Sequence, residues 1–217
     1  MRNKLISTFQ YITPNLDHQD DYLYDIRKVC SKGVKWVQLR MKAFPKPIIL
    51  QTAYLAKEIC DNYGCQLIIN DHPEIANKVK AAGVHVGKED QKVEEIRYRF
   101  GNAMIIGATA NTLEDILKVI EYVDYIGLGP FRFTSTKKKL SPILGLEGYK
   151  EILGQLVLQG KDIPVVGIGG IGMDDLAELK NTGLHGIAAS GLVQKAENPE
   201  IIIQEIIKTF DYVDHCQ

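Results

Sequence analysis

The sequence has no excess of charge of either sign. Its 217 residues include 26 Lys and Arg against 27 Asp and Glu, so the formal net charge is −1 at pH 7. A chain without a basic excess cannot neutralise a long phosphate backbone, which argues against a general nucleic-acid binder. A local basic cluster could still hold a small anionic ligand.

Long hydrophobic runs are absent as well. Ser7 and Gln10 interrupt the first apolar run too early for a secretory signal. No stretch approaches the ~20 apolar residues of a membrane-spanning helix, so we expect no association with a membrane.

The cysteines and histidines form no familiar motif. The four cysteines are Cys30, Cys60, Cys65 and Cys216, without a C-x-x-C pair or a zinc-ligand spacing. We therefore expect free thiols in a reducing compartment and a cytoplasmic protein. The histidines show no metal-ligand spacing, and His85, inside an expected strand, reads as a hydrogen-bonded core residue. No G-x-S-x-G motif is present.

Short apolar runs alternate with longer amphipathic stretches, such as 48–63, along the whole chain. Several short runs are almost continuously apolar, which is typical of parallel strands buried on both faces. The expected strands are 9–12, 36–39, 66–69, 84–86, 104–107, 125–128, 164–168 and 186–189. Eight strands, each followed by a helical stretch, predict an α/β fold of the (β/α)8 TIM-barrel type.

An open doubly wound sheet is the alternative fold, but no G-x-G-x-x-G follows the first strand. No linker or change of composition divides the chain. We therefore assign residues 1–217 to a single TIM-barrel domain.

Polar residues follow the expected strands, where a barrel of this kind carries its chemistry. Gln38, Arg40 and Lys42 alternate along an extended segment, so their side chains should point to the same side. Two cations there suit a phosphate or diphosphate, which Arg can bind through two hydrogen bonds. The alternative is that they are solvated loop charges.

Asp71 and Asp90 follow adjacent expected strands. Mg²⁺ favours a site with few carboxylate ligands, completed by substrate phosphates. We therefore expect Asp71 and Asp90 to bind Mg²⁺, with Glu89 as a weaker candidate ligand. The alternative is that both aspartates cap helices, since Asp71 precedes His72-Pro73 and Asp90 precedes a helical stretch.

The turns after the last three strands suit a second phosphate. Glycine-rich turns follow strands seven and eight, the usual phosphate position in such barrels, although tight geometry alone could explain them. The candidate residues are Thr134, Thr136, Lys137, Gly170, Ser190 and Gly191. The residues by themselves thus indicate a Mg²⁺-assisted enzyme acting on a diphosphate and a second phosphorylated molecule.

Six segments, in order across nearly the whole chain, resemble one known family. They are VQLRMK (37–42), IIND (68–71), AAGVHVGKED (81–90), DYIGLGPFRFTSTK (124–137), GLEG (145–148) and PVVGIGGI (164–171). Together they resemble thiamine-phosphate synthase, also called thiamine-phosphate pyrophosphorylase. The resemblance implies a transferase of thiamine biosynthesis that joins a hydroxymethylpyrimidine diphosphate to a thiazole phosphate, releasing thiamine monophosphate and diphosphate.

The resemblance also implies roles for single residues. The pyrimidine diphosphate would be held by Gln38, Arg40, Lys42, Asn70, Thr109 and Lys137, of which Arg40, Lys42, Thr109 and Lys137 would act on the leaving diphosphate. The thiazole phosphate would be held by Thr134, Thr136, Gly170, Ser190 and Gly191, and Mg²⁺ by Asp71 and Asp90. The implied mechanism is dissociative: diphosphate leaves before the thiazole nitrogen captures the pyrimidine cation.

Three positions depart from the family pattern. Thr109 and Asn111 stand where Ser and His are usual, Lys88 replaces a Gln, and Arg132-Phe133 replaces Phe-Pro. A thiazole tautomerase-like protein and a non-catalytic barrel that binds thiazole or thiamine phosphate are the alternatives. The tautomerase uses the His that Asn111 replaces, and a non-catalytic barrel would not need two metal-binding aspartates. The partners expected are the small-molecule substrates, and association into a homo-oligomer stays open.

Overall fold

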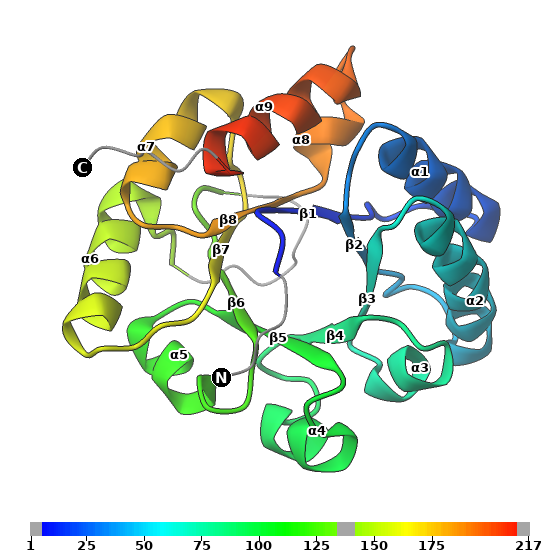
Figure 1. Ribbon diagram of the computed structural model, residues 1–217, viewed down its shortest axis with the longest axis horizontal. Helices are drawn as coiled ribbons and strands as arrows, with labels where there is room; N and C mark the ends of the chain where they lie inside the picture. The colour runs from blue at the N-terminus through cyan, green and yellow to red at the C-terminus, as the bar shows by residue number, and fades with distance from the viewer. Residues whose placement is uncertain (1–5, 134–141, 212–217) are drawn as a thin grey trace.

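The computed structural model describes residues 6–133 and 142–211 and shows a closed barrel of eight parallel strands surrounded by helices (Figure 1). The strands are β1 (Phe9–Ile12), β2 (Trp36–Leu39), β3 (Gln66–Asn70), β4 (Gly83–Val86), β5 (Ile105–Ala110), β6 (Tyr125–Leu128), β7 (Val165–Ile168) and β8 (Gly186–Ala189). Each strand pairs with the next along the chain, so the predicted (β/α)8 barrel is confirmed.

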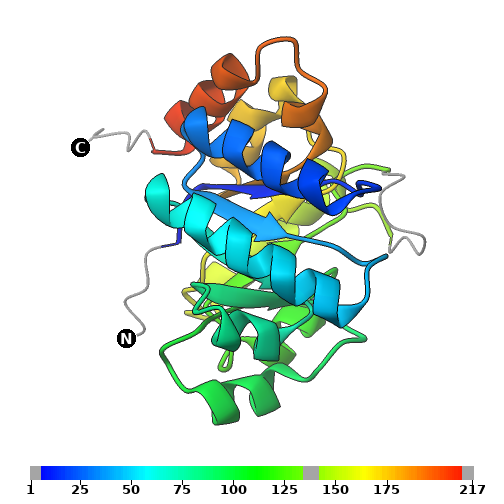
Figure 2. The same ribbon diagram turned by 90° about the vertical axis from the view of Figure 1, so that its right-hand side faces the viewer.

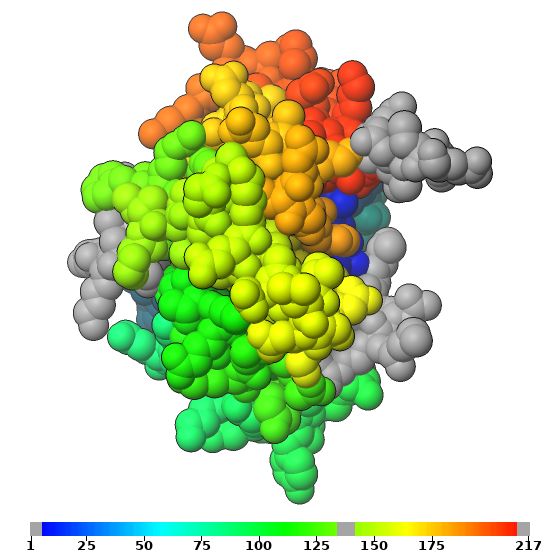
Figure 3. All heavy atoms as spheres, turned by 90° about the vertical axis from the view of Figure 1, so that its left-hand side faces the viewer, coloured from blue at the N-terminus to red at the C-terminus, as the bar shows by residue number. Residues whose placement is uncertain are grey.

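Helices follow every strand and cover the outside of the barrel. They are α1 (Gln19–Ser31), α2 (Lys46–Asn62), α3 (Pro73–Lys78), α4 (Val93–Phe100), α5 (Leu113–Val119), α6 (Gly145–Leu158), α7 (Leu176–Asn181), α8 (Gly191–Gln194) and α9 (Pro199–Asp211), with a short 3₁₀ helix at Met173–Asp175. Figure 2 shows α1 and α2 side by side over β1 and β2, and Figure 3 shows α6 and α7 covering another face. None of the helices in the described ranges is long and apolar enough to cross a membrane.

The predicted strand bounds are right to within a few residues, and the largest difference has a consequence for the site. β5 runs to Ala110 instead of ending at 107, because its pairing with β6 continues as far as Ala110 opposite Leu128. Thr109, expected in the loop after the strand, therefore lies inside β5. Its position is fixed by the sheet.

Two hydrophobic layers hold the barrel together. The inner one fills the barrel itself and includes Trp36, Ile68, Tyr125 and Val166, with the Trp36 and Tyr125 rings 4.8 Å apart and edge to face. The outer one packs the other faces of the strands against the helices. Because both faces are buried, the strands need apolar residues at nearly every position, which explains their continuous apolar sequences.

A buried arginine ties α4 to the strands behind it. The Arg97 guanidinium donates to the Asp124 carboxylate at 2.7 Å and to the backbone carbonyls of Tyr122, Gly101 and Met104. The same carboxylate oxygen of Asp124 accepts the Ile106 N–H at 2.8 Å. This single side chain thus fixes the amino-terminal ends of β5 and β6.

Barrel closure depends on a glycine at the seam between β8 and β1. The Ile187 N–H donates to the Thr8 carbonyl at 2.9 Å, and the preceding residue, Gly186, lies against the same carbonyl. A Cβ at Gly186 would be only 1.9 Å from the Thr8 oxygen. Any side chain there must push the two strands apart.

Gly186→Ala should therefore lower the free energy of unfolding by about 1–3 kcal/mol or more, the cost of overpacking a close contact. Gly154→Ala is the matched control, because Gly154 is exposed on α6 and a Cβ there meets nothing within 4 Å. The control should raise stability by about 0.5–1 kcal/mol, since Ala favours a helix over Gly. Urea denaturation measures both, and similar effects of the two variants would contradict the role of Gly186.

Candidate functional site

A pocket opens at the carboxyl ends of the strands, and side chains from all eight strands line it. Because the strands are parallel, these ends meet at one rim, as expected for a barrel of this kind. The lining residues are Gln10, Ile12, Gln38, Arg40, Lys42, Asn70, Asp71, His85, Gly87, Thr109, Tyr125, Gly127, Val166, Ile168 and Ala188. Six residues that the sequence analysis assigned to the site are among them: Gln38, Arg40, Lys42, Asn70, Asp71 and Thr109.

The segment that continues from β2 carries the two cations into this pocket. Gln38, Arg40 and Lys42 all line it, as their alternation predicts. The Arg40 N–H donates to the Thr13 hydroxyl at 2.9 Å, and the Arg40 guanidinium donates to the Asn15 side-chain oxygen at 2.9 Å. Burial lowers the pKa of Arg40, although a guanidinium stays charged at neutral pH. Both cations therefore belong to the pocket wall, Arg40 held by hydrogen bonds and Lys42 at 48% side-chain exposure.

Asp71 points its carboxylate at Lys42. The Asp71 backbone has φ of 63°, in the left-handed region that residues other than glycine seldom adopt, and its N–H donates to the His85 carbonyl at 2.8 Å. This backbone turn places Asp71 Oδ2 at 2.9 Å from Lys42 Nζ. The carboxylate is mostly buried, at 16% side-chain exposure, while Lys42 is half exposed.

The carboxyl groups of Asp71 and Asp90 lie close enough to affect each other's pKa. Burial raises the pKa of Asp71 and the Lys42 ammonium opposes that shift, but the neighbouring Asp90 carboxylate raises the pKa further. Burial also acts to raise the pKa of Asp90, but the neighbouring Asp71 and the hydrogen bond from the Gly87 N–H hold it below its ordinary value. The two groups thus hold a proton on Asp71 more firmly than on Asp90.

The alternative that these aspartates cap helices is wrong. The N-cap residue of α3 is His72 and that of α4 is Lys92, and neither helix has a side-chain cap. Asp90 instead accepts the Gly87 N–H at 2.8 Å, which closes the turn after β4. Neither carboxylate is therefore used as a helix cap: Asp71 faces Lys42, and Asp90 holds its own turn.

A chain of buried polar side chains crosses the floor of the pocket. Gln38 donates to Gln10 at 3.0 Å, and Gln10 donates to the Tyr125 hydroxyl at 3.1 Å. The Tyr125 hydroxyl lies 3.0 Å from His85 Nδ1, and His85 Nε2 lies 3.0 Å from the Thr109 hydroxyl. Burial raises the pKa of Tyr125, so it stays protonated and can donate to Nδ1, which leaves Nε2 to donate to Thr109.

Three members of this chain, Gln10, His85 and Tyr125, were not assigned to the site by the sequence analysis. His85 is hydrogen-bonded as expected of a core residue, but it also lines the pocket. A signal for it exists in the sequence, because Gln10, Gln38 and His85 are polar residues inside otherwise apolar strands. A polar side chain buried within a strand needs a partner, and parallel strands supply it at the same level of the barrel.

The glycine turn after β7 lies beside the loop after β6. Gly169 and Gly170 have φ of 93° and 71°, and the Arg132 N–H donates to the Gly169 carbonyl at 2.8 Å. The Arg132 guanidinium binds the Asp175 carboxylate with two hydrogen bonds and lies over the Phe131 ring. Arg132, a departure from the family pattern, thus fixes this loop to the turn after β7.

The second phosphate site is described only in part. Gly170 is exposed, and Ser190 and Gly191 are half-buried at the start of α8, where the Ser190 side chain does not cap the helix. These residues lie after β7 and β8 but do not line the pocket described above. Thr134, Thr136 and Lys137 lie outside the described residues.

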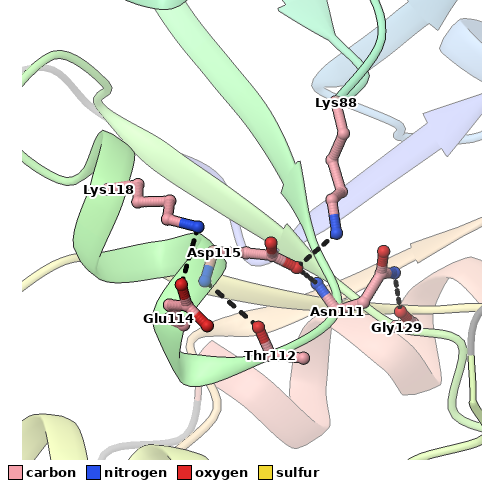
Figure 4. Close-up of polar contacts among 7 residues, drawn as sticks. All are labelled: Lys88, Asn111, Thr112, Glu114, Asp115, Lys118 and Gly129. Atoms are coloured by element: carbon pink, nitrogen blue, oxygen red, sulfur yellow. Dashed lines mark hydrogen bonds and ion pairs between the residues drawn. The ribbon is translucent and has the colours of Figure 1, made fainter.

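The other two departures form one polar cluster, shown in Figure 4. Asp115 accepts from Lys88 Nζ at 2.7 Å and from the Asn111 N–H at 3.0 Å, and its own N–H donates to the Thr112 hydroxyl at 3.1 Å. The Asn111 side chain donates to the Gly129 carbonyl. Lys88 therefore forms an ion pair with Asp115, and the cluster joins the loops after β4, β5 and β6.

Asp115→Asn should lower the Tm at pH 7 by about 2–6 °C, because an amide cannot replace the charge-assisted bonds of the carboxylate. Burial acts to raise the pKa of Asp115, but the hydrogen bonds from Lys88 and the Asn111 N–H lower it overall. A lowered pKa stabilises the fold above the ordinary carboxyl value and loses that effect as the group protonates. The difference in Tm between the two proteins should therefore shrink below about pH 4. A difference that stays constant with pH would contradict this role.

Comparisons with known proteins agree with this geometry. The family described as Thiamine monophosphate synthase matches residues 9–193. The chain is 42% identical over 209 residues to the thiamine-phosphate synthase of Flavobacterium psychrophilum, covering 96% of this chain and 99% of the relative. It is 45% identical over 193 residues to that of Bacteroides fragilis, covering 88% and 94%.

A solved structure gives the same result. The thiamine phosphate pyrophosphorylase from Pyrococcus furiosus superposes with a TM-score of 0.79 at 28% identity, covering 97% of both chains. The barrel, the rim residues and these likenesses lead to one conclusion: the chain belongs to the thiamine monophosphate synthase family and is an enzyme of thiamine biosynthesis.

Proposed function

We propose that the enzyme condenses hydroxymethylpyrimidine diphosphate with a thiazole phosphate, giving thiamine monophosphate and diphosphate. One observation carries this proposal: the pocket joins two cations and a carboxylate to a floor of uncharged polar groups. Arg40, Lys42 and Asp71 line its mouth, while Gln38 and Asn70 are almost fully buried within it. The charged mouth of the pocket suits a diphosphate, and the uncharged polar floor suits the flat, polar ring attached to it.

The aspartate pair fits a Mg²⁺ ion. Asp71 and Asp90 are neighbouring carboxyl groups, and the charge of Asp90 raises the pKa of Asp71, so a divalent cation between them would relieve the repulsion of two negative charges. Two carboxylates next to a phosphate site is the ligand set that Mg²⁺ takes when substrate oxygens complete its coordination. Asp71 and Asp90 would hold the ion, which would supply positive charge to the leaving diphosphate.

The residues of the chain then have separate tasks. Arg40 and Lys42 bind the diphosphate oxygens, and Lys137 and the Thr109 hydroxyl add donors to the same group. Gln38 and Asn70 orient the pyrimidine. Because His85 holds the Thr109 hydroxyl and Tyr125 holds His85, these positions are set before the substrate enters.

Bond making and breaking need little proton transfer. The carbon–oxygen bond to the diphosphate breaks with its electron pair leaving on oxygen, and the thiazole nitrogen lone pair forms the new bond to that carbon. Negative charge grows on the diphosphate during this step, so cations aimed at it stabilise the transition state more than the ground state. The backbone at Gly170 and the residues Ser190, Gly191, Thr134 and Thr136 hold the thiazole phosphate, whose charge does not change.

Incubation with both substrates and Mg²⁺ tests the proposal, with thiamine monophosphate detected by mass. Product should form only when both substrates are present. An isomerised thiazole without condensation would instead indicate a tautomerase, and binding of either substrate without turnover would indicate a binding protein.

Asp90→Asn should lower kcat by more than about 100-fold, because the amide loses the charge needed for the cation. The amide oxygen can still accept the Gly87 N–H, so the Tm should change little. Asp61→Asn, at an exposed carboxylate on α2, is the control and should keep full activity. If Asp90→Asn stays active but loses stability, the carboxylate serves only to close its turn.

Lys42→Gln should lower kcat by about 100-fold, as expected for loss of one donor to a developing charge. Ser190→Ala should instead raise the KM for the thiazole phosphate with kcat unchanged, because its contact is equal in ground and transition states. Lys118→Gln, an exposed lysine on α5 paired with Glu114, is the control for loss of a charge. Steady-state kinetics with each substrate varied in turn distinguish these effects, and a change in thiazole KM alone for Lys42→Gln would contradict the assignment.

A further inference from the structure

Three buried cysteines meet at the end of the barrel opposite the pocket. Cys30 lies near the end of α1, Cys60 near the end of α2, and Cys65 directly before β3. Their sulfur atoms all lie within 4.8 Å of one another. Among the residues that the structure describes, this is the one group of three potential metal ligands gathered so closely.

The backbone holds the three thiols in place independently of any bond between them. The Cys65 N–H donates to the Cys60 carbonyl at 2.8 Å, which closes the tight turn between α2 and β3. Lys35, just before β2, donates from Nζ to the Tyr63 carbonyl in that turn at 2.8 Å. Cys30 reaches the same point because α1 packs against α2. All three sulfurs are thus presented by rigid elements.

The surroundings favour negative charge on sulfur. The Lys35 ammonium is bound to the Tyr63 carbonyl, in the same turn that presents Cys60 and Cys65, so a cation lies beside the thiols. Cys30 and Cys60 are 3% and 0% exposed, so a charge there must be compensated inside the protein.

We propose that Cys30, Cys60 and Cys65 form a structural site for Zn²⁺. Zinc–sulfur bonds of ~2.3 Å in a tetrahedral site place sulfur atoms ~3.8 Å apart, which the observed separations allow with little movement. Each thiol gives its proton to solvent as its sulfur binds the metal. The three sulfurs leave one tetrahedral position, which a water molecule would fill.

The charge balance favours Zn²⁺ over the other common thiophilic ion, Cu(I). Three thiolates and Zn²⁺ leave a net charge of −1, which the Lys35 ammonium cancels, whereas Cu(I) leaves −2 and only half of it is cancelled. Buried cysteines that serve only in packing act as small apolar side chains. Such cysteines do not need a nearby cation, whereas these three have Lys35 beside them. The position at the amino-terminal end of the strands gives the metal a role in stability, by joining α1, α2 and β3.

The test uses the full chain, stripped of metal by a chelator under reducing conditions and then titrated with Zn²⁺. We expect one zinc per chain by native mass spectrometry. The Tm should rise by about 5–10 °C at a free zinc concentration a hundred times the Kd. Titration with Co²⁺ should give the intense sulfur-to-metal absorption of thiolate coordination. Parallel titration with Cu(I) tests the charge argument, and tighter binding of Cu(I) with no shift by Zn²⁺ would overturn the assignment of the ion.

Variants test whether these three cysteines are the zinc ligands. Cys30→Ala and Cys65→Ser should each abolish the zinc-dependent rise in Tm, and Lys35→Gln should weaken zinc binding about tenfold while keeping all three ligands. Cys216→Ser, at a cysteine outside the described residues, should bind zinc like the parent chain. Activity in excess Mg²⁺ shows which variants fold. The proposal fails if the parent chain binds no zinc, if Cys216→Ser abolishes binding, or if the thiols instead form a disulfide that excludes the metal. None of these outcomes bears on the proposed reaction.

Discussion

The hydrogen bonding of β1 to both β2 and β8 is the constraint on which the rest of the structure depends. Once the parallel sheet is closed, all eight strands must end at the same rim, whatever their distance in the chain. Residues as far apart as Gln10 and Ala188 then line one pocket. Closure also leaves no exposed sheet edge, so the chain can use strands of only four to six residues.

The interior of the barrel has an apolar end and a polar end. Trp36, Ile68 and Ile105 fill the end where the strands begin, and the chain of hydrogen bonds from Gln38 to Thr109 fills the other. A polar network buried on rigid strands is already aligned before a substrate arrives, which reduces the reorganisation needed in the reaction. The Thr109 hydroxyl is thus oriented by His85, which Tyr125 holds in turn.

Much of the fold could be predicted from the sequence because burial on both faces leaves a clear signal. The eight apolar runs gave the barrel, and the polar residues after them gave Arg40, Lys42, Asp71 and Asp90. The ion pair between Lys42 and Asp71 could not be predicted, since it depends on the left-handed backbone at Asp71.

Other features were hidden for different physical reasons. In a strand buried on both sides, hydrophobicity does not show which side chains face the interior, so Tyr125 gave no sign of its role. The three cysteines have no motif because their proximity arises from the packing of α1 against α2. Sequence patterns report local spacing, whereas these contacts depend on tertiary structure.

The buried guanidinium of Arg97 has a consequence for how this protein can diverge. Its donors are matched to carbonyls in two short connections, residues 101–104 and 122, as well as to Asp124. Inserting or deleting a residue in either connection would move a carbonyl away and leave a buried donor without its acceptor. The two connections that precede β5 and β6 should therefore tolerate fewer changes of length than a solvated loop would.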